Sequence, residues 1–362
     1  MTRCGRAREL SSGIASRTNF ARAALRRLAL PGMRFFGTFL SSLLLHLSLV
    51  PLWIGSPIPF FYFLYLVYTG LCDFDLAAVV YGSLGVGAMA YLNWGRTFAY
   101  RPWAVELCYK LNMTAYYREC RLHGALDTMR TERTFYLFHP HGILSVGFVA
   151  NGVWSREFNL RASAPGAEKE ATWRGTAFLI AANLREWSAF FKVFCDLGGR
   201  LESATRANIM KLMAAGRNLA IIPGGFEDAT RHKRGAERTA MSGRKGFVKY
   251  ALQHGYALTP IYTFGESETY HTFTGLLPLR LWINRFQIPA VLFFGEPWCP
   301  ILPRRDTRCL SCVGEPLQLP RIEAPTQAQI DEWHAEYLNA LRVTFDRHKA
   351  EAGKPDAVLE VY

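Results

Sequence analysis

The sequence predicts an α/β fold, in which a mixed or mostly parallel sheet is covered by helices and follows an N-terminal transmembrane helical hairpin. Two observations lead to this prediction. Beyond residue 96, short apolar runs alternate with helical patterns, as in strand–helix–strand folds. Before it, the 38 residues 35–72 contain no Asp, Glu, Lys or Arg. One membrane-spanning helix needs only about 20 apolar residues.

The chain divides into three regions by composition. Residues 1–34 carry eight arginines and one acid, which predicts a flexible basic segment, either a cytosolic flank of the membrane region or an organellar transit peptide. Residues 35–95 form the membrane-embedded helical region, because a second uncharged run, 76–95, follows the first. Two spans, three spans and a hairpin that dips in and returns all remain open. Residues 96–362 form the globular domain.

Charge and cysteine content restrict the classes of partner. The net charge of +13 favours an anionic membrane surface or a phosphate-bearing ligand. The sequence has no zinc-finger spacing and no aromatic signature of RNA-binding domains, so a nucleic-acid partner is not expected. Cys309 and Cys312 are the only close cysteine pair, and one such pair favours free thiols over a zinc site.

Five apolar runs and three helical patterns account for most of the globular domain. The runs that read as buried strands are 133–138, 176–182, 218–223, 256–264 and 290–297. A first helix starts at the cap Thr205 and stops at Gly216, and a second ends at Gly255. A third opens with the capping box Thr326–Gln329. Its core side consists of Ile330, Trp333, Tyr337, Leu341 and Phe345.

His139 and His141 follow the first predicted strand in the segment His-Pro-His-Gly. A spacing of two points both side chains to one side of an extended chain. Three interpretations stay open from these residues alone. The histidines are a metal pair that needs further ligands, polar groups in a tight turn with Gly142, or an acid/base site in which a neutral imidazole takes a proton from an alcohol.

Gly224 and Gly225 follow the third predicted strand and precede Glu227 and Asp228. A Gly-Gly turn allows main-chain N–H groups to approach an anion or a developing oxyanion. The two acids are candidates to orient a histidine, and a turn with solvated acids is the alternative.

Seven basic residues with one opposing acid occupy the 19 positions from 231 to 249. They are Arg231, Lys233, Arg234, Arg238, Arg244, Lys245 and Lys249. The cluster leads into a predicted helix that starts near residues 243–245, and helix N-termini bind anions. A solvated surface is the alternative interpretation.

Several of these segments also resemble one known family. "FHPHG", "PGGFED", "GRKGFVKYALQHG", "PIYTFGESETY" and the segment from "GEPLQLP" onward are similar, in order, to blocks of the type-2 diacylglycerol acyltransferases. That family includes monoacylglycerol and wax-ester acyltransferases. The Phe-Glu-Asp sequence that follows the Gly-Gly pair resembles that of algal or protist members more than that of animal ones. Two departures are visible: Asp228 stands where a Glu is usual, and Arg185 keeps its position without the usual proline.

The resemblance implies a glycerolipid-acyltransferase-like fold and transfer of an acyl group from acyl-CoA to diacylglycerol. It implies that His141 is the general base with His139 beside it, that Asp228 or Glu227 supports the imidazole, and that Gly224 and Gly225 bind the oxyanion. The residues expected at the CoA phosphates are Arg185, Arg244, Lys245 and Lys249.

The same resemblance implies no cofactor beyond the substrate acyl-CoA, and no metal. It places the protein in the endoplasmic reticulum membrane and at lipid droplets, or in a plastid membrane if residues 1–34 are a transit peptide, and it leaves a homo-oligomer open. Monoacylglycerol or a long-chain alcohol as acceptor is one alternative. A catalytically silent membrane protein that binds lipid is the other.

Overall fold

The structure, a computed structural model, describes residues 31–55, 57–186, 188–286 and 290–362. The basic segment predicted for 1–34 therefore lies almost wholly outside the described residues. Of the N-terminal region, the structure describes helix α2, Pro31–Gly55.

The central feature is an eight-stranded sheet in the order β1-β10-β7-β2-β5-β3-β4, with β11 also paired to β7. Its strands are β1 (Glu119–Gly124), β2 (Thr134–His139), β3 (Ala177–Ile180), β4 (Leu201–Ser203), β5 (Leu219–Ile221), β7 (Ala257–Phe264), β10 (Arg308–Val313) and β11 (Leu317–Gln318). Only β10 and β11 run antiparallel to β7, and the other neighbouring pairs are parallel. The predicted mixed, mostly parallel sheet is confirmed.

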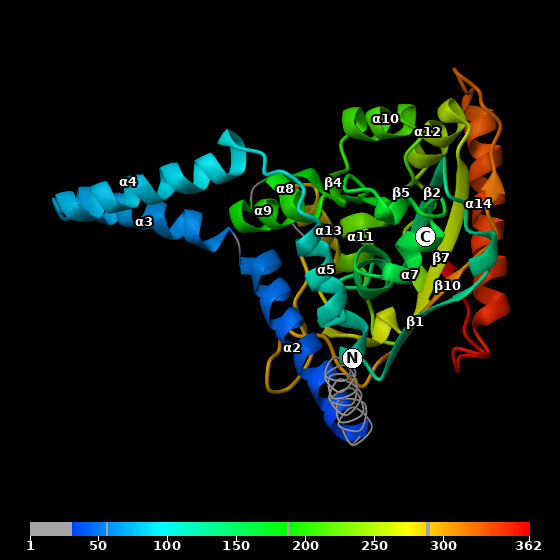
Figure 1. Ribbon diagram of the computed structural model, residues 1–362, viewed down its shortest axis with the longest axis horizontal. Coiled ribbons are helices and arrows are strands. Elements are labelled where there is room, and N and C mark those ends of the chain that lie inside the picture. The colour runs from blue at the N-terminus through cyan, green and yellow to red at the C-terminus, as the bar shows by residue number, and fades with distance from the viewer. Residues whose placement is uncertain (1–30, 56, 187, 287–289) are drawn as a thin grey trace, which may run out of the picture.

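Helices cover both faces of this sheet, which is why all six residues of β2 are buried. Phe135 and Leu137 share a core with α10 (Arg206–Ala214), α12 (Gly246–His254) and α14 (Gln327–His348). Tyr136 and Phe138 face the opposite core. Helices on that side include α5 (Pro102–Leu111), α7 (Arg156–Arg161) and α9 (Ala189–Gly198). Figure 1 shows α14 running along the strands β7 and β10.

The three predicted helices are confirmed, together with their caps. The Thr205 side chain accepts a hydrogen bond from the Asn208 N–H at the start of α10. Gly255 ends α12 in the left-handed conformation, at φ 65°. Thr326 and Gln329 form the reciprocal capping box of α14.

The buried strand predicted at 290–297 is wrong. Within the described part of that run, only Phe293–Phe294 form a strand, β9, which pairs with β8 (His271–Thr272) outside the main sheet. The chain folds back at once, because the Gly295 N–H donates to the Pro300 carbonyl at 2.8 Å. Phe294 is consequently 54% exposed. The strands β1, β4, β10 and β11 have no counterpart in the sequence prediction.

Cys309 and Cys312 both lie in β10 and are free. They belong to cores on opposite faces of the sheet, because residues three apart on a strand point in opposite directions. They therefore cannot bind one metal ion together, which agrees with the expected free thiols.

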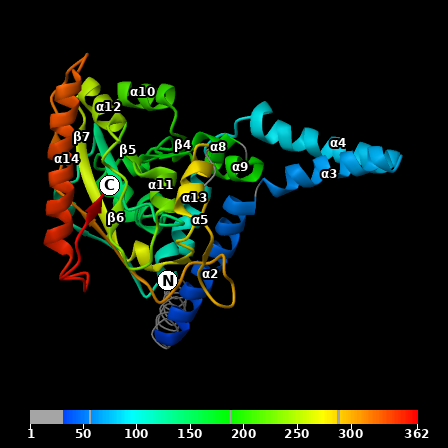
Figure 2. The same cartoon turned by 180° about the vertical axis from the view of Figure 1, so that it is seen from behind.

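An arm of two apolar helices extends from the body of the protein (Figures 1 and 2). It consists of α3 (Ile58–Cys72) and α4 (Leu76–Ala90), and α4 continues as a π-helix, Tyr91–Gly95. The two run antiparallel and pack closely, because a Cβ on Gly82 would lie 2.9 Å from the Phe63 carbonyl oxygen. The 20-residue stretch Leu76–Gly95 has a mean hydropathy of 1.4 and is long and apolar enough to cross a membrane.

Candidate active site

His139 is the last residue of β2, and both of its ring nitrogens have partners. Nε2 lies 2.7 Å from the hydroxyl of Tyr337 on α14, and Nδ1 lies 3.0 Å from the hydroxyl of Thr239. The Thr239 hydroxyl donates to Asp228, so it accepts from Nδ1–H, and Nε2 accepts from Tyr337. Burial lowers the pKa of His139 to about 3. This histidine is therefore neutral, fully buried and hydrogen-bonded on both sides.

His141 is only half-buried, and its contacts define the same tautomer as that of His139. Its Nδ1 lies 3.0 Å from the carbonyl oxygen of Gly142 and 3.3 Å from the hydroxyl of Ser145. A carbonyl only accepts, so Nδ1 carries the proton and Nε2 carries the lone pair. Among the described residues, no hydrogen bond to Nε2 is found. Burial lowers the pKa of His141, and the Gly142 carbonyl partly opposes this. The result is a neutral imidazole with an acceptor nitrogen, the state that a general base requires.

Asp228 lies in the short helix α11 (Gly225–Thr230) and is buried beside the two histidines. Its carboxylate accepts from the main-chain N–H of His141 at 3.3 Å and from the hydroxyls of Thr239 at 3.1 Å and Tyr362 at 3.3 Å. The N–H of Ala240 donates to it as well. Burial raises the pKa of Asp228 to about 6, and these hydrogen bonds oppose the rise.

The contact made by Asp228 differs from the expected one. The sequence prediction has an acid hydrogen-bonded to the imidazole of the base, whereas here the carboxylate holds the main chain of His141 and the imidazole proton goes to Gly142. Tyr362 reaches Asp228 because β12 (Glu360–Val361) pairs with β6 (Arg238–Thr239). Sequence reasoning missed Thr239, Tyr337 and Tyr362 as partners of the site.

Glu227, the neighbour of Asp228, points away from the histidines. Its carboxylate lies 3.1 Å from Nε of Arg231 and 3.4 Å from a guanidinium nitrogen of Arg244, and its side chain is 35% exposed. Of the two candidate acids, the structure brings only Asp228 together with His139 and His141.

The glycines of the site leave space for carboxylates. A Cβ on Gly142 would lie 2.3 Å from Oε1 of Glu266, and one on Gly224 would lie 2.1 Å from Oδ2 of Asp228. Gly142 also has φ +60°, which a side chain rarely adopts. The Gly225 N–H donates to the Ile222 carbonyl at 3.3 Å, so it is committed to the turn. Of the two predicted oxyanion residues, Gly225 is therefore the less available as a donor.

Glu266 is a buried carboxylate that the sequence prediction did not assign to the site. Its two oxygens accept from the N–H groups of Val146 and Gly147 at 2.9 and 2.8 Å, and so hold the segment after His141. Burial raises the pKa of Glu266 to about 7. One signal could have found it: β7 and β2 are parallel neighbours, so the residues that follow them lie at one edge of the sheet.

The four basic residues expected at CoA do not lie together. Arg185, in α8 (Ala182–Glu186), forms an ion pair with the buried Asp196 at 2.6 Å and donates to the Leu201 carbonyl. Arg244 is paired with Glu227, and Lys245 with Asp331 at 2.8 Å. Lys249 is exposed on α12. Arg244, Lys245 and Lys249 therefore share the exposed surface at the start of α12, while Arg185 contributes to an internal network elsewhere.

Residues 89–362 match the family model described as diacylglycerol acyltransferase. The chain belongs to the type-2 diacylglycerol acyltransferase family. It contains the His-Pro-His-Gly segment, the Gly-Gly turn and the C-terminal helix inside the matched range.

Individual relatives are 29–33% identical. Human diacylglycerol O-acyltransferase 2-like protein 6 is 33% identical over 233 residues, which cover 60% of this chain and 66% of that protein. Human acyl-CoA wax alcohol acyltransferase 1 is 32% identical, over 59% of this chain and 66% of its own length. Diacylglycerol O-acyltransferase 2 from Bos taurus is 29% identical over 82% of both chains. The match thus spans just under two thirds of these two human relatives. No solved structure matches.

Proposed function

We propose that this protein is a membrane-bound acyltransferase that moves a fatty acyl group from acyl-CoA to diacylglycerol and so makes triacylglycerol. The observation that carries the proposal is the state of His141. Its Nδ1–H donates to the Gly142 carbonyl, so Nε2 carries the lone pair, two residues beyond the end of β2. Family membership supports acyl transfer as the reaction for which this base is used.

The proposed reaction follows from the positions of the protons in the site. The acceptor hydroxyl gives its proton to Nε2 of His141 while its oxygen attacks the thioester carbonyl. The tetrahedral oxyanion collapses, the ester forms, and the CoA thiolate leaves and takes the proton back from the imidazolium. The Gly142 carbonyl stabilises the imidazolium through Nδ1–H, and Asp228 keeps the main chain of His141 in position. The main-chain N–H of Gly224 is the proposed oxyanion donor.

Arg244, Lys245 and Lys249 are the proposed binding residues for the CoA phosphates. Their surface position suits a highly charged ligand that arrives from water, and the carboxylate partners of Arg244 and Lys245 are exposed side chains that can exchange for phosphate. Arg185 is a weaker candidate, because its partner Asp196 is buried and releasing it would leave an unpaired charge inside the protein.

The arm of α3 and α4 is the proposed membrane anchor and the route of the apolar acceptor and product. Large apolar side chains on both helices are exposed, including Phe61 at 64%, Tyr68 at 66% and Leu84 at 69%. Exposed apolar surface of this extent is typical of contact with lipid. We place the protein in the endoplasmic reticulum membrane, with access to lipid droplets.

A long-chain alcohol is the second candidate acceptor, favoured by the 32% identity to a human wax alcohol acyltransferase. The test is to express the full chain in a host that lacks neutral-lipid synthesis and to supply labelled acyl-CoA with diacylglycerol, monoacylglycerol or a fatty alcohol. Triacylglycerol should be the main product, and His141→Gln should lower its rate about 100-fold or more. His254→Gln, on α12, is the matched control and should keep wild-type activity. Equal rates for His141→Gln and the control would exclude the proposed base.

A further inference from the structure

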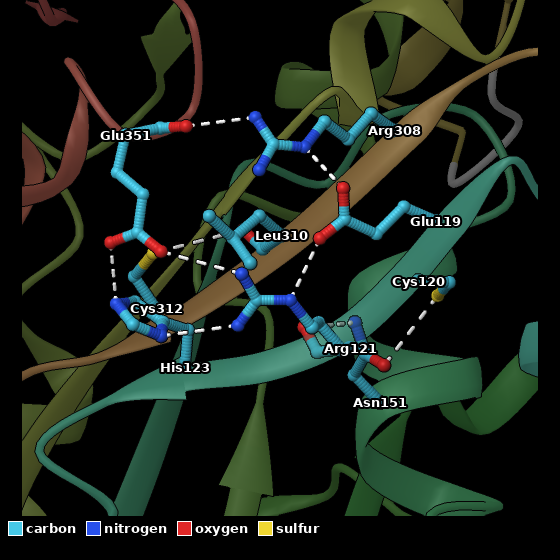
Figure 3. Close-up of polar contacts among 9 residues, drawn as sticks. All are labelled: Glu119, Cys120, Arg121, His123, Asn151, Arg308, Leu310, Cys312 and Glu351. Carbon is cyan, nitrogen blue, oxygen red and sulfur yellow. Dashed lines mark hydrogen bonds and ion pairs between the residues drawn. The ribbon is translucent and has the colours of Figure 1, made fainter.

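A second cluster of ionisable side chains lies where strand β1 meets the end of helix α14. His123 is the penultimate residue of β1, His348 is the last residue of α14, and Glu351 follows three residues later. One ligand atom from each of the three lies within 4.8 Å of the others. Nε2 of His123 is 2.6 Å from a carboxylate oxygen, Oε2, of Glu351. Figure 3 shows His123 and Glu351 facing each other across this contact.

We propose that His123, His348 and Glu351 form a binding site for a divalent transition-metal ion of the zinc class. Two imidazoles and one carboxylate are a donor set that zinc uses when a fourth position is left for water. Imidazole ligands select zinc, copper and nickel over magnesium and calcium. This site is separate from His139 and His141, whose ring nitrogens serve the acyl-transfer site.

The surrounding residues hold the carboxylate ligand in place. The main-chain carbonyl of Glu351 accepts from Arg308 at 2.8 Å, and its Oε1 accepts from Arg121 at 3.3 Å, which leaves Oε2 directed at His123. Glu119 binds both arginines and keeps them oriented (Figure 3). Hydrogen bonds of this outer layer orient the ligands of metal sites.

Two features of the main chain also favour the site. The last carbonyls of α14, a helix of 22 residues, give its C-terminal end a partial negative charge that attracts cations. Gly124, beside His123, provides space for the second imidazole, because a Cβ there would lie 3.2 Å from Nε2 of His348.

The contact with Arg121 defines which ring nitrogen of His123 carries the proton before a metal ion binds. Its guanidinium donates to Nδ1 of His123 at 3.2 Å, so Nε2 carries the imidazole proton in the metal-free protein. A metal ion at Nε2 requires that proton to move to Nδ1, and the contact of Nδ1 with Arg121 then opens. Arg121 can lose this one contact, because its side chain is 43% exposed and its bonds to Glu119 at 2.7 Å and to Glu351 at 3.3 Å use its other two guanidinium nitrogens.

The site is connected with the active site through the sheet and through α14. His123 pairs with Cys312, Cys312 with Tyr262, and Tyr262 with His139, so all four lie in one row. Helix α14 contacts both ends of the row, His139 through Tyr337 and His123 through His348. A bound ion would therefore fasten the C-terminal end of the helix whose Tyr337 holds His139.

The test uses the full chain in detergent, purified without a histidine tag and freed of metal with a chelator. Calorimetric titration with Zn²⁺ should give one saturable site per chain, and Co²⁺ should give the visible absorption of a four-coordinate ion. Glu351→Gln and His123→Gln should each weaken Zn²⁺ binding about tenfold or more. Both side chains are partly exposed, so circular dichroism without metal should be unchanged.

His254→Gln removes a histidine elsewhere and should bind Zn²⁺ as wild type does. At a Zn²⁺ concentration near the wild-type Kd, Zn²⁺ should raise the Tm of wild type and of this control more than that of Glu351→Gln. The absence of saturable binding to wild type would overturn the proposal. Equal affinity of Glu351→Gln and His254→Gln would overturn it too, because the ion would then bind somewhere else.

Discussion

His139 and His141 are two residues apart, yet their ring nitrogens have different partners. His139 is hydrogen-bonded through both nitrogens inside the protein, whereas no described residue forms a hydrogen bond with Nε2 of His141, the nitrogen that we propose takes the substrate proton. The sequence alone left a metal pair, a turn and an acid/base site open. These contacts support the acid/base interpretation for His141 and a positioning role for His139.

Substitution of the two histidines should separate these tasks. His139→Gln should lower both the Tm and the activity, because a buried residue with two hydrogen bonds loses at least one of them. His141→Gln should abolish most activity and leave the Tm close to that of wild type, since the side chain is only half-buried. Thermal unfolding and acyl-transfer assays on the same preparations measure both. A large loss of Tm in His141→Gln, or full activity in His139→Gln, would contradict the assignment.

Glu266 should make stability depend on pH. Below its ordinary pKa of 4.5 the carboxyl is protonated in the native and the unfolded chain, and between 4.5 and about 7 only the native chain binds the proton. Unfolding then releases a proton, so raising the pH through this window destabilises the native state. The contribution lost is about 3 kcal/mol, from 1.36 kcal/mol for each pKa unit.

The measurement is denaturant unfolding of wild type and Glu266→Gln at pH 5 and pH 8. The free energy of unfolding of wild type relative to the variant should be larger at pH 5 than at pH 8, because Gln does not titrate. A difference that stays constant between these pH values would show that Glu266 has no raised pKa.

Composition and order located the candidate residues but not their contacts. Glu227 and Asp228 are adjacent and chemically alike, and only the helical turn of α11 decides that Asp228 points inward. Thr239 and Tyr362 lie 11 and 134 positions from Asp228. Ordinary residues brought in over such separations carry no signal in a single sequence.

At the scale of elements, helix α14 shows what the apolar periodicity of the sequence can predict and what it cannot. Its capping box and its core side, including Tyr337, follow from the sequence and are confirmed. The hydrogen bond of the Tyr337 hydroxyl could not be predicted in this way, because its partner His139 is 198 positions away. The apolar stripe thus predicts which face is buried, and only the fold reveals that the helix also holds a histidine.

Tyr337→Phe tests that contact directly. The change keeps the buried ring and removes the donor to Nε2 of His139, so a buried acceptor loses its partner. The free energy of unfolding should fall by about 1–3 kcal/mol. Tyr250→Phe, a half-buried tyrosine on α12, is the control for loss of a phenolic hydroxyl. Denaturant unfolding measures both, and an equal effect of the two substitutions would contradict a stabilising bond to His139.

Strand prediction failed where composition and environment disagree. The run 290–297 is apolar enough for a buried strand, but Gly295 and the following prolines turn the chain and leave Phe294 exposed. Conversely, β1 contains Glu119, Arg121 and His123, whose ion pairs at the edge of the sheet replace an apolar pattern. Tertiary contacts decide both cases.

At the scale of the whole molecule, the lengths of the helices in the arm decide which of them can cross a membrane. Helix α3 has 15 residues, or about 22 Å at 1.5 Å per residue, which is shorter than the roughly 30 Å of a bilayer core. Leu76–Gly95 is long enough to cross. Counting uncharged residues could not reveal that the two helices differ in length, because the position of the break between them depends on turn geometry. A hairpin that enters the membrane with its tip, residues 73–75, is the arrangement that we propose.

Cys72, at the end of α3, reports on that tip. It is an exposed free thiol, and Asp73 follows it at the turn. If the arm is inserted from the cytosolic side, the membrane should protect this thiol from an impermeant maleimide until detergent is added. The experiment uses intact microsomes that contain a variant with Cys4, Cys120 and Cys299 replaced by serine.

The control for reagent access is Glu323→Cys in the same background with Cys72 also replaced. The Glu323 side chain is 88% exposed in the globular domain, so this thiol should react without detergent. Cys72 should react only after the membrane is dissolved, because the apolar faces of α3 and α4 gain more from lipid than from water. Equal labelling of Cys72 and of the control in intact microsomes would mean that the arm lies outside the bilayer. The exposed apolar side chains would then need a protein partner to cover them.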